Sequence, residues 1–269
     1  MNYVAPVTLE EAYDALQAED ATCLAGGQSL VAMMNLGLAS PACLVSLRRI
    51  DALRGIERGP DGGLRIGAMT CHAELAALQV PEPGPALLAK AARVVAYPAI
   101  RARGTIGGSV ALADPSADYP VVLQAADASI ELGSAGGTRR VAARDFFLGL
   151  FETAREAGEI VLAIHLPPGP AGGGSAYEKL TLVAGDFAIV SVAAVAGAAV
   201  DLAVGGCGTT PIRLAGIEPT DAALLSAGRD VAATCKPTDD HRASAAYRRR
   251  VLPELIRRAG RAAAARGLV

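Results

Sequence analysis

The pattern of apolar and polar residues changes repeatedly along the chain, from short strand-like runs to helical stripes and back. Near the start, Thr8 and Glu11 have the spacing of a capping box, and apolar residues follow at helical intervals, which predicts a short first helix. Thr70 is expected to cap a later helix. A longer helical stripe covers 85–96, and Pro98 is expected to end it. Apolar runs bounded by turn residues predict strands at 22–25, 42–47 and 64–69.

The densest run of proline and glycine, PPGPAGGG at 167–174, is the best candidate for a domain boundary. A strand-like run at 159–166 precedes it. Beyond it, strand-like runs at 176–182 and 187–195 lead to a helical stripe at 244–265. Strands and helices are therefore mixed irregularly on both sides of the boundary, which indicates an α+β fold class with a smaller second α+β domain.

Composition excludes several classes of protein. Apolar residues make up 52% and charged residues 19%, enough for a large core, and the net charge of −2 argues against a nucleic-acid partner. The apolar stretch at 187–200 is shorter than the roughly 20 residues that span a membrane, so we expect a buried strand there and no membrane span. The N-terminal residues lack a secretory signal pattern. The five cysteines are dispersed without any C-x-x-C pair, which indicates reduced thiols in the cytoplasm and neither a zinc nor an iron–sulfur site.

Two glycine turns, AGGQSL at 25–30 and GTIGGS at 104–109, share one design. Paired glycines let the backbone approach a ligand closely at positive φ, so that successive N–H groups converge on an anion. Two such turns would suit a dinucleotide pyrophosphate, and Gly27 and Gly108 are expected where the backbone nearly touches it. The alternative is that each turn only connects a strand to a helix. Neither the dinucleotide-binding G-x-G-x-x-G fingerprint nor a P-loop is present, which argues against both of those folds.

The two turns and the segments around them resemble the FAD-binding medium subunits of molybdenum hydroxylases and the flavin domain of xanthine dehydrogenase. The resemblance rests on LAGGQSLVAMMNLGLASPACLVSLRRI, IGAMTCHAEL, TIGGS followed by ADPSAD, AYEKL and SAAYRRRVL, which stand in the family's order along nearly the whole chain. Gln28 occupies a position where relatives often carry histidine.

The resemblance implies a two-lobed FAD-binding domain of the vanillyl-alcohol-oxidase-like type at 1–166, with lobes of about 1–52 and 53–166. A linker at 167–174 and a C-terminal flavoprotein domain at 175–269 would follow. The cofactor would be FAD, with no catalytic acid or base and no metal on this chain. The cofactor-binding residues that it implies are Ala25, Gly26, Gly27, Gln28, Ser29, Leu30, Ile100, Gly104, Thr105, Gly107, Gly108, Ser109, Asp114, Asp118, Tyr177 and Lys179.

Individual roles also follow from the resemblance. Asp118 would bind the polar chain of the flavin as an exposed pocket contact, and Tyr177 and Lys179 would lie beside the isoalloxazine ring. The alternatives are that Asp114 and Asp118 only form turns, and that Tyr177 is an ordinary strand aromatic. The sequence departs from the family at 181–183, Thr-Leu-Val, where relatives often carry basic residues.

Two further sets of polar residues have simple interpretations. The histidines His72, His165 and His241 are far apart without ligand spacing, and we expect structural roles for them. The arginines at 248–250 and 257–261 form either a solvated helix face or a surface for a partner subunit.

The function implied by the resemblance is electron transfer within a complex. A large molybdenum subunit would hydroxylate the substrate at its molybdenum cofactor, a small iron–sulfur subunit would carry two [2Fe–2S] clusters, and FAD on this chain would pass electrons to an external acceptor. The expected assembly is a dimer of heterotrimers. Two other functions stay open, a stand-alone flavoprotein oxidase of related fold and a scaffold subunit without flavin.

Overall fold

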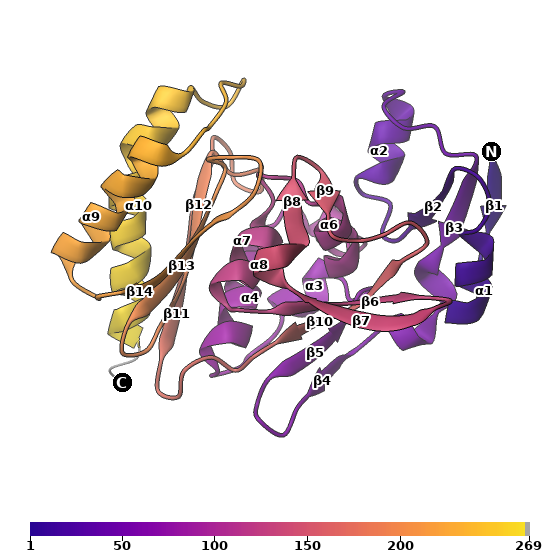
Figure 1. Ribbon diagram of the computed structural model, residues 1–269, viewed down its shortest axis with the longest axis horizontal. Coiled ribbons are helices and arrows are strands. Elements are labelled where there is room, and N and C mark those ends of the chain that lie inside the picture. Colours follow the sequence, from indigo (N-terminus) through magenta and orange to yellow (C-terminus); the bar gives the residue numbers. More distant parts are fainter. Residues whose placement is uncertain (267–269) are drawn as a thin grey trace.

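The computed structural model describes residues 1–266, which form three main sheets that follow one another along the molecule (Figure 1). The N-terminal sheet is parallel in the order β1-β3-β2. The capping residue Thr8 starts α1 as predicted, because its Oγ1 accepts a hydrogen bond from the Glu11 N–H at 3.2 Å. The elements of this part are β1 (Asn2–Val4), α1 (Leu9–Ala15), β2 (Ala21–Leu24), α2 (Leu30–Asn35), β3 (Cys43–Ser46) and the 3-10 turns η1 (Leu47–Arg49) and η2 (Asp51–Leu53).

The middle sheet is antiparallel around β10 in the order β4-β5-β10-β6-β7. Strand β10 is central and its residues are buried except for His165, which agrees with the apolar run IVLAIHL. The sheet strands are β4 (Ile56–Arg58), β5 (Leu64–Gly67), β6 (Ser129–Ser134), β7 (Gly137–Ala142) and β10 (Ile160–Leu166), and a separate hairpin joins β8 (Phe147–Gly149) to β9 (Glu152–Thr153). The helices of this part are α3 (His72–Ala76), α4 (Pro83–Val94), α5 (Pro98–Arg101), α6 (Ile106–Leu112), α7 (Asp118–Ala125) and α8 (Ala143–Phe146).

The third sheet is covered on both faces. Its antiparallel strands are β11 (Gly174–Leu180), β12 (Val190–Ala196), β13 (Val200–Gly205) and β14 (Ile212–Ile217), and its helices are α9 (Asp221–Thr234) and α10 (Ala245–Arg266). Every residue of β12 is buried, because Val192 and Ala194 face the core beneath α10 while Ala193 and Val195 join the core around α4 and α7 (Figure 1). The C-terminal sheet therefore shares its second face with the part of the chain before residue 167.

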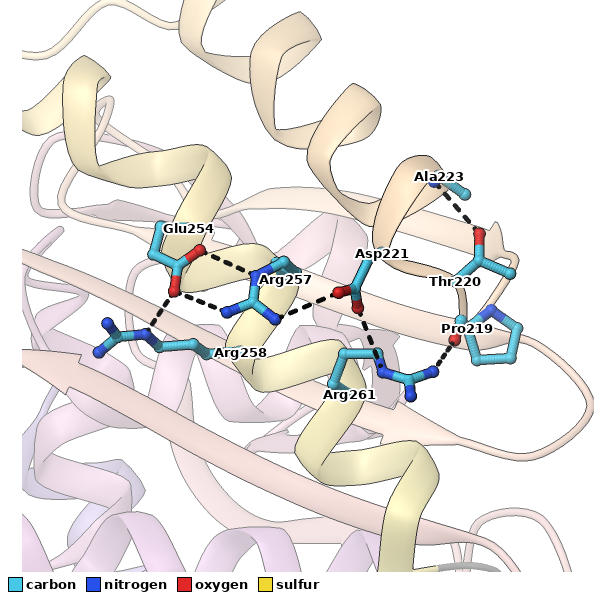
Figure 2. Close-up of polar contacts among 8 residues, drawn as sticks. All are labelled: Pro219, Thr220, Asp221, Ala223, Glu254, Arg257, Arg258 and Arg261. Atoms are coloured by element: carbon cyan, nitrogen blue, oxygen red, sulfur yellow. Dashed lines mark hydrogen bonds and ion pairs between the residues drawn. The ribbon is translucent and has the colours of Figure 1, made fainter.

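Arginines near the C-terminus form ion pairs and hydrogen bonds with other residues of this chain. Arg257 binds Glu254 at 2.8 Å and Asp221 at 3.5 Å, and Arg261 donates to the Pro219 carbonyl oxygen at 2.6 Å, so that α10 is tied to the start of α9 (Figure 2). Arg248 is buried, and it donates to the carbonyl oxygen of Gly206. The side chains of Arg257 and Arg261 are partly exposed, as a solvated helix face requires. Arg248 is only 3% exposed, so this interpretation is wrong for Arg248.

Two local expectations are also wrong. Cys71, not Thr70, is the N-cap of α3, where the Glu74 carboxylate accepts from the Cys71 N–H at 2.8 Å, while the Thr70 hydroxyl donates to the Gly55 carbonyl oxygen. Pro98 does not end α4, which stops at Val94, and instead begins α5, where its missing N–H costs nothing. Within residues 1–266, no helix is long and apolar enough to cross a membrane.

Candidate functional site

A cavity of about 680 Å³ lies where the two glycine turns meet, and this volume is usual for a cofactor site. The backbone of both turns contributes to its wall, together with the segment that leads into β10. The sequence-predicted residues that line it are Ala25, Gly26, Gly27, Gln28, Ser29, Leu30, Ile100, Gly104, Thr105, Gly107, Gly108, Ser109 and Asp118. Three other predicted residues lie outside this lining, namely Asp114, Tyr177 and Lys179.

The first glycine turn offers unpaired backbone amides to the cavity. Gly27 has a φ of +73°, so the expected positive φ is confirmed there. Within the described residues, the N–H groups at 26–30 have no hydrogen-bond acceptor, although the Gln28 side chain donates to the Gly26 carbonyl oxygen at 3.1 Å. Buried or concave amides of this kind require a partner. A run of them on one wall attracts an anion such as a pyrophosphate.

The second glycine turn uses its amides inside the chain. Gly107 donates to the Ala68 carbonyl oxygen at 2.9 Å, Gly108 donates to Thr105 Oγ1 at 3.2 Å, and Ser109 donates to the Thr105 carbonyl oxygen. The reason is that α6 begins directly after its N-cap, Thr105, so both glycines are helical and neither has positive φ. The expectation that the amides of Gly107 and Gly108 converge on an anion at positive φ is therefore wrong.

Close backbone packing explains two of the glycines. A Cβ atom at Gly26 would lie 2.1 Å from the Arg103 carbonyl oxygen, and one at Gly107 would lie 2.5 Å from the Cβ of Ala68. Both distances are far shorter than any van der Waals contact. Gly26 thus lets the first turn lie directly against the second, and Gly107 lets α6 lie against the end of β5. These two glycines therefore have a role in packing, whatever they also contribute to the cavity.

Asp118 lies at the cavity wall and is held from behind by two side chains of β11. The Tyr177 hydroxyl donates to Asp118 Oδ1 at 2.5 Å, and Lys179 Nζ lies 3.0 Å from the same carboxylate. Burial raises the pKa of the Asp118 carboxyl, although Lys179 and Tyr177 act in the opposite direction. Asp118 is only 6% exposed, so it lines the cavity as a buried residue, and the expectation that it is exposed is wrong. Tyr177 and Lys179 contact Asp118, and their predicted place beside the flavin ring stays a prediction.

Asp114 and the histidines occupy separate environments. Asp114 accepts a hydrogen bond from the Ser116 N–H at 2.8 Å, as a turn-forming residue does. His72 borders the cavity, and its Nδ1 lies 2.9 Å from the Tyr119 hydroxyl. His165 bonds a carboxylate of the middle sheet and His241 is exposed. Within residues 1–266, no group of three potential ligands is arranged to hold a metal ion.

Several lining residues were not predicted from the sequence. They include Ala96, Arg155, Glu159 and Phe187, which come from loops far apart along the chain. Ala96 has a φ of +45°, and a Cβ atom on Gly185 would lie 2.9 Å from its carbonyl oxygen, so the Gly185 turn places the following residues against it. The Gly-Asp turn before Phe187 is a usable signal for the loop, but nothing in the sequence indicates which segment it contacts.

The cavity fits the expected cofactor in its chemistry. Its lining is mostly apolar, with a few polar groups gathered at the glycine turns, as is usual where a large ring system and an anionic group are bound together. The unpaired amides at 26–30 suit a pyrophosphate, and the apolar walls formed by residues such as Ile100 and Phe187 suit aromatic rings. The residues present therefore fit FAD.

Comparison with known proteins agrees with this site. Residues 1–169 match the family described as FAD binding domain in molybdopterin dehydrogenase, and residues 175–263 match the CO dehydrogenase flavoprotein C-terminal domain. The chain is 37% identical to the carbon monoxide dehydrogenase medium chain of Hydrogenophaga pseudoflava, with 98% of this chain and 97% of that protein covered. It is 35% identical to the glyceraldehyde dehydrogenase medium chain of Sulfolobus acidocaldarius, with 96% of each covered.

Solved structures resemble the whole fold. Carbon monoxide dehydrogenase from Hydrogenophaga pseudoflava matches with a TM-score of 0.93 and 36% identity, over 99% of this chain and 98% of that one. Quinoline 2-oxidoreductase from Pseudomonas putida 86 matches with a TM-score of 0.90 and 29% identity, over 100% and 98%. The predicted cofactor, FAD, and the predicted class, an oxidoreductase subunit, are confirmed by the family. The chain belongs to the FAD-binding medium subunits of the molybdenum hydroxylases.

Proposed function

We propose that this chain takes electrons from the [2Fe–2S] clusters of a partner subunit and passes them through FAD to an external acceptor. The observation that carries the flavin site is the run of unpaired amides at 26–30 on the wall of a cavity of about 680 Å³. The electron donor and acceptor are inferred from the family. In this proposal, residues 1–166 form an FAD-binding domain of the vanillyl-alcohol-oxidase-like type. Residues 175–269 form the C-terminal flavoprotein domain. The matched ranges 1–169 and 175–263 support this division.

Each part of the site has a separate task in this proposal. The amides at 26–30 bind the pyrophosphate, and the positive φ of Gly27 suits a turn whose N–H groups converge on an anion. Asp118, fixed by Tyr177 and Lys179, presents its remaining acceptor capacity to hydroxyl groups of the flavin's polar chain. When bound, FAD supplies the capacity to accept single electrons and to deliver one or two. The chain contributes position, exclusion of water and the electrostatic surroundings of the ring.

The proposed partners are inferred from the descriptions of the relatives. Relatives are described as medium chains or medium subunits, which supports an assembly with a larger and a smaller chain. In the proposed assembly the large subunit holds the molybdenum cofactor, the small subunit holds the iron–sulfur clusters, and two heterotrimers form a dimer. The five cysteines of this chain are free thiols, as is common in the cytoplasm, where we place the complex.

The two alternative functions give different results in one experiment. The native complex is purified through this chain, and its subunit masses, flavin and metals are measured together with its activity. We expect near-stoichiometric FAD on this chain, with molybdenum and iron on two other subunits. Recovery as a metal-free, partner-free active enzyme whose flavin bleaches with substrate would establish the oxidase instead. A flavin-free chain in an active complex would establish the scaffold.

A further inference from the structure

His72 and Tyr119 form a buried pair at the edge of the cavity. His72 is the first residue of α3 and Tyr119 the second residue of α7. Their rings are tilted with centroids 5.2 Å apart, and His72 Nδ1 lies 2.9 Å from the Tyr119 hydroxyl oxygen. His72 is 6% exposed and Tyr119 is 1% exposed, yet His72 also borders the cavity. One edge of the imidazole thus faces Tyr119.

The Tyr119 hydroxyl decides which ring nitrogen of His72 carries the hydrogen atom. A buried hydroxyl has one hydrogen to donate, and leaving it without an acceptor is costly. Within the described chain, the partner of the Tyr119 hydroxyl is His72 Nδ1. The hydroxyl therefore donates and Nδ1 accepts. In a neutral imidazole the hydrogen then sits on Nε2.

Nε2 has no hydrogen-bond partner in the described chain, and it is not completely buried, so a ligand atom can reach it. It lies on the side of Gly104, because a Cβ atom at that glycine would be 2.7 Å from Nε2. Gly104 in turn lies against Gly26, where the run of unpaired amides begins. His72 thus lines the cavity with its Nε2 next to Gly104, the residue that contacts the turn carrying these amides.

We propose that His72 donates a hydrogen bond from Nε2–H to the pyrophosphate of bound FAD, and that Tyr119 is the positioning residue that fixes this tautomer. The inference rests on the proposed FAD site and adds a side-chain donor to it. It also explains why a histidine lies beside an anion site without acting as a cation. Burial and the nearby Arg101 guanidinium lower the pKa of His72 to about 4, so the ring is neutral near pH 7.

The tautomer is tested directly by ¹⁵N NMR of the flavin-free protein labelled at its histidines. The chain has three histidines, so the two ring-nitrogen signals of His72 are assigned as those that disappear in His72→Gln. We expect a protonated Nε2 and an unprotonated Nδ1 at His72, and a shift of the Nε2 signal when FAD is added. Tyr119→Phe should allow both tautomers, an effect that a purely structural role of Tyr119 does not produce. A hydrogen on Nδ1 in the wild type, or an Nε2 signal that FAD leaves unchanged, would overturn the inference.

Affinity for FAD gives an independent readout. The double variant His72→Leu with Tyr119→Phe removes the donor without leaving a buried hydroxyl unpaired, and we expect its dissociation constant for FAD to rise about ten- to 150-fold. His72→Gln retains an N–H donor near the Nε2 position and should lose less affinity. Equal affinity of the double variant and the wild type would refute the inference. If the wild type itself fails to bind FAD, the proposed function fails first, whereas the tautomer measured without FAD remains a separate result.

Discussion

The hydroxyl of Tyr177 donates a hydrogen bond to the Asp118 carboxylate across 2.5 Å, which joins strand β11 to the start of α7. Lys179, two residues further along the same face of β11, lies 3.0 Å from the same carboxylate. The C-terminal sheet thus supports the cavity wall through a buried polar cluster. A residue expected to serve mainly the ligand also serves the packing of the two parts of the chain.

The first prediction concerns the stability of Asp118→Ala in the flavin-free protein. The side chain of Lys179 is 7% exposed, so removal of Asp118 takes away its counter-charge and leaves the ammonium group with only the Val94 carbonyl oxygen among its described hydrogen-bond partners. We expect a loss of about 3–5 kcal/mol in the free energy of unfolding, measured by urea denaturation. An exposed pocket contact, as the sequence predicted for Asp118, would have had little effect on the free energy of unfolding.

A double-mutant cycle separates this cost from other effects of the alanine. Asp118→Ala combined with Lys179→Met removes both charges, and we expect it to be more stable than Asp118→Ala alone. If the single and double variants unfold at the same urea concentration, the ion pair does not support the cavity wall.

The second prediction uses two glycines with similar backbones. Gly27 has a φ of +73° and lines the cavity, whereas Gly37 has a φ of +71° and a Cβ atom there would meet nothing within 4 Å. Valine at either position adopts a strained φ, at a cost of about 1–3 kcal/mol. Only Gly27→Val should also lose FAD, because it disturbs the unpaired amides. Flavin content of the two purified variants measures the difference, and retention of FAD by Gly27→Val would count against the anion site at 26–30.

The third prediction compares the adjacent glycines of α6. Gly107→Ala would place its Cβ 2.5 Å from Ala68 Cβ and 2.7 Å from the Ala68 carbonyl oxygen, so we expect a loss of about 1–3 kcal/mol. Gly108→Ala would meet Thr105 Oγ1 at 3.1 Å and Ala25 Cβ at 3.4 Å, and an alanine in a helix gains up to about 1 kcal/mol. We expect Gly108→Ala to keep the wild-type melting temperature within a few degrees. Equal melting temperatures of both variants would contradict the packing role of Gly107.

Local chemistry made part of this site predictable from the sequence. The turn at Gly27 needs a positive φ that glycine supplies. In the first helix, the Thr8 side chain accepts a hydrogen bond from the N–H of Glu11, only three residues away. Both features were therefore predicted correctly. Contacts between distant segments were not predictable. Nothing near Gly26 indicates that it lies against Arg103, and nothing near Asp118 indicates that β11 supplies its partners. Such long-range contacts depend on how the sheets pack, which local patterns do not encode.

The last prediction concerns acid stability and His72. The pKa of His72 is lowered from 6.5 to about 4 in the folded protein, because burial and the nearby Arg101 disfavour the charged ring. The unfolded chain therefore takes up a proton at higher pH than the folded chain does. The contribution of His72 to the free energy of unfolding is therefore complete above about pH 6.5. It falls by about 3 kcal/mol as the pH drops toward 4. Replacement by glutamine removes this contribution, so urea unfolding of His72→Gln should depend less steeply on pH between 6.5 and 4 than that of the wild type. His241→Gln, at an exposed position, is the matched control and should keep the wild-type slope. Identical slopes for all three proteins would show that His72 takes up its proton equally in the folded and unfolded states.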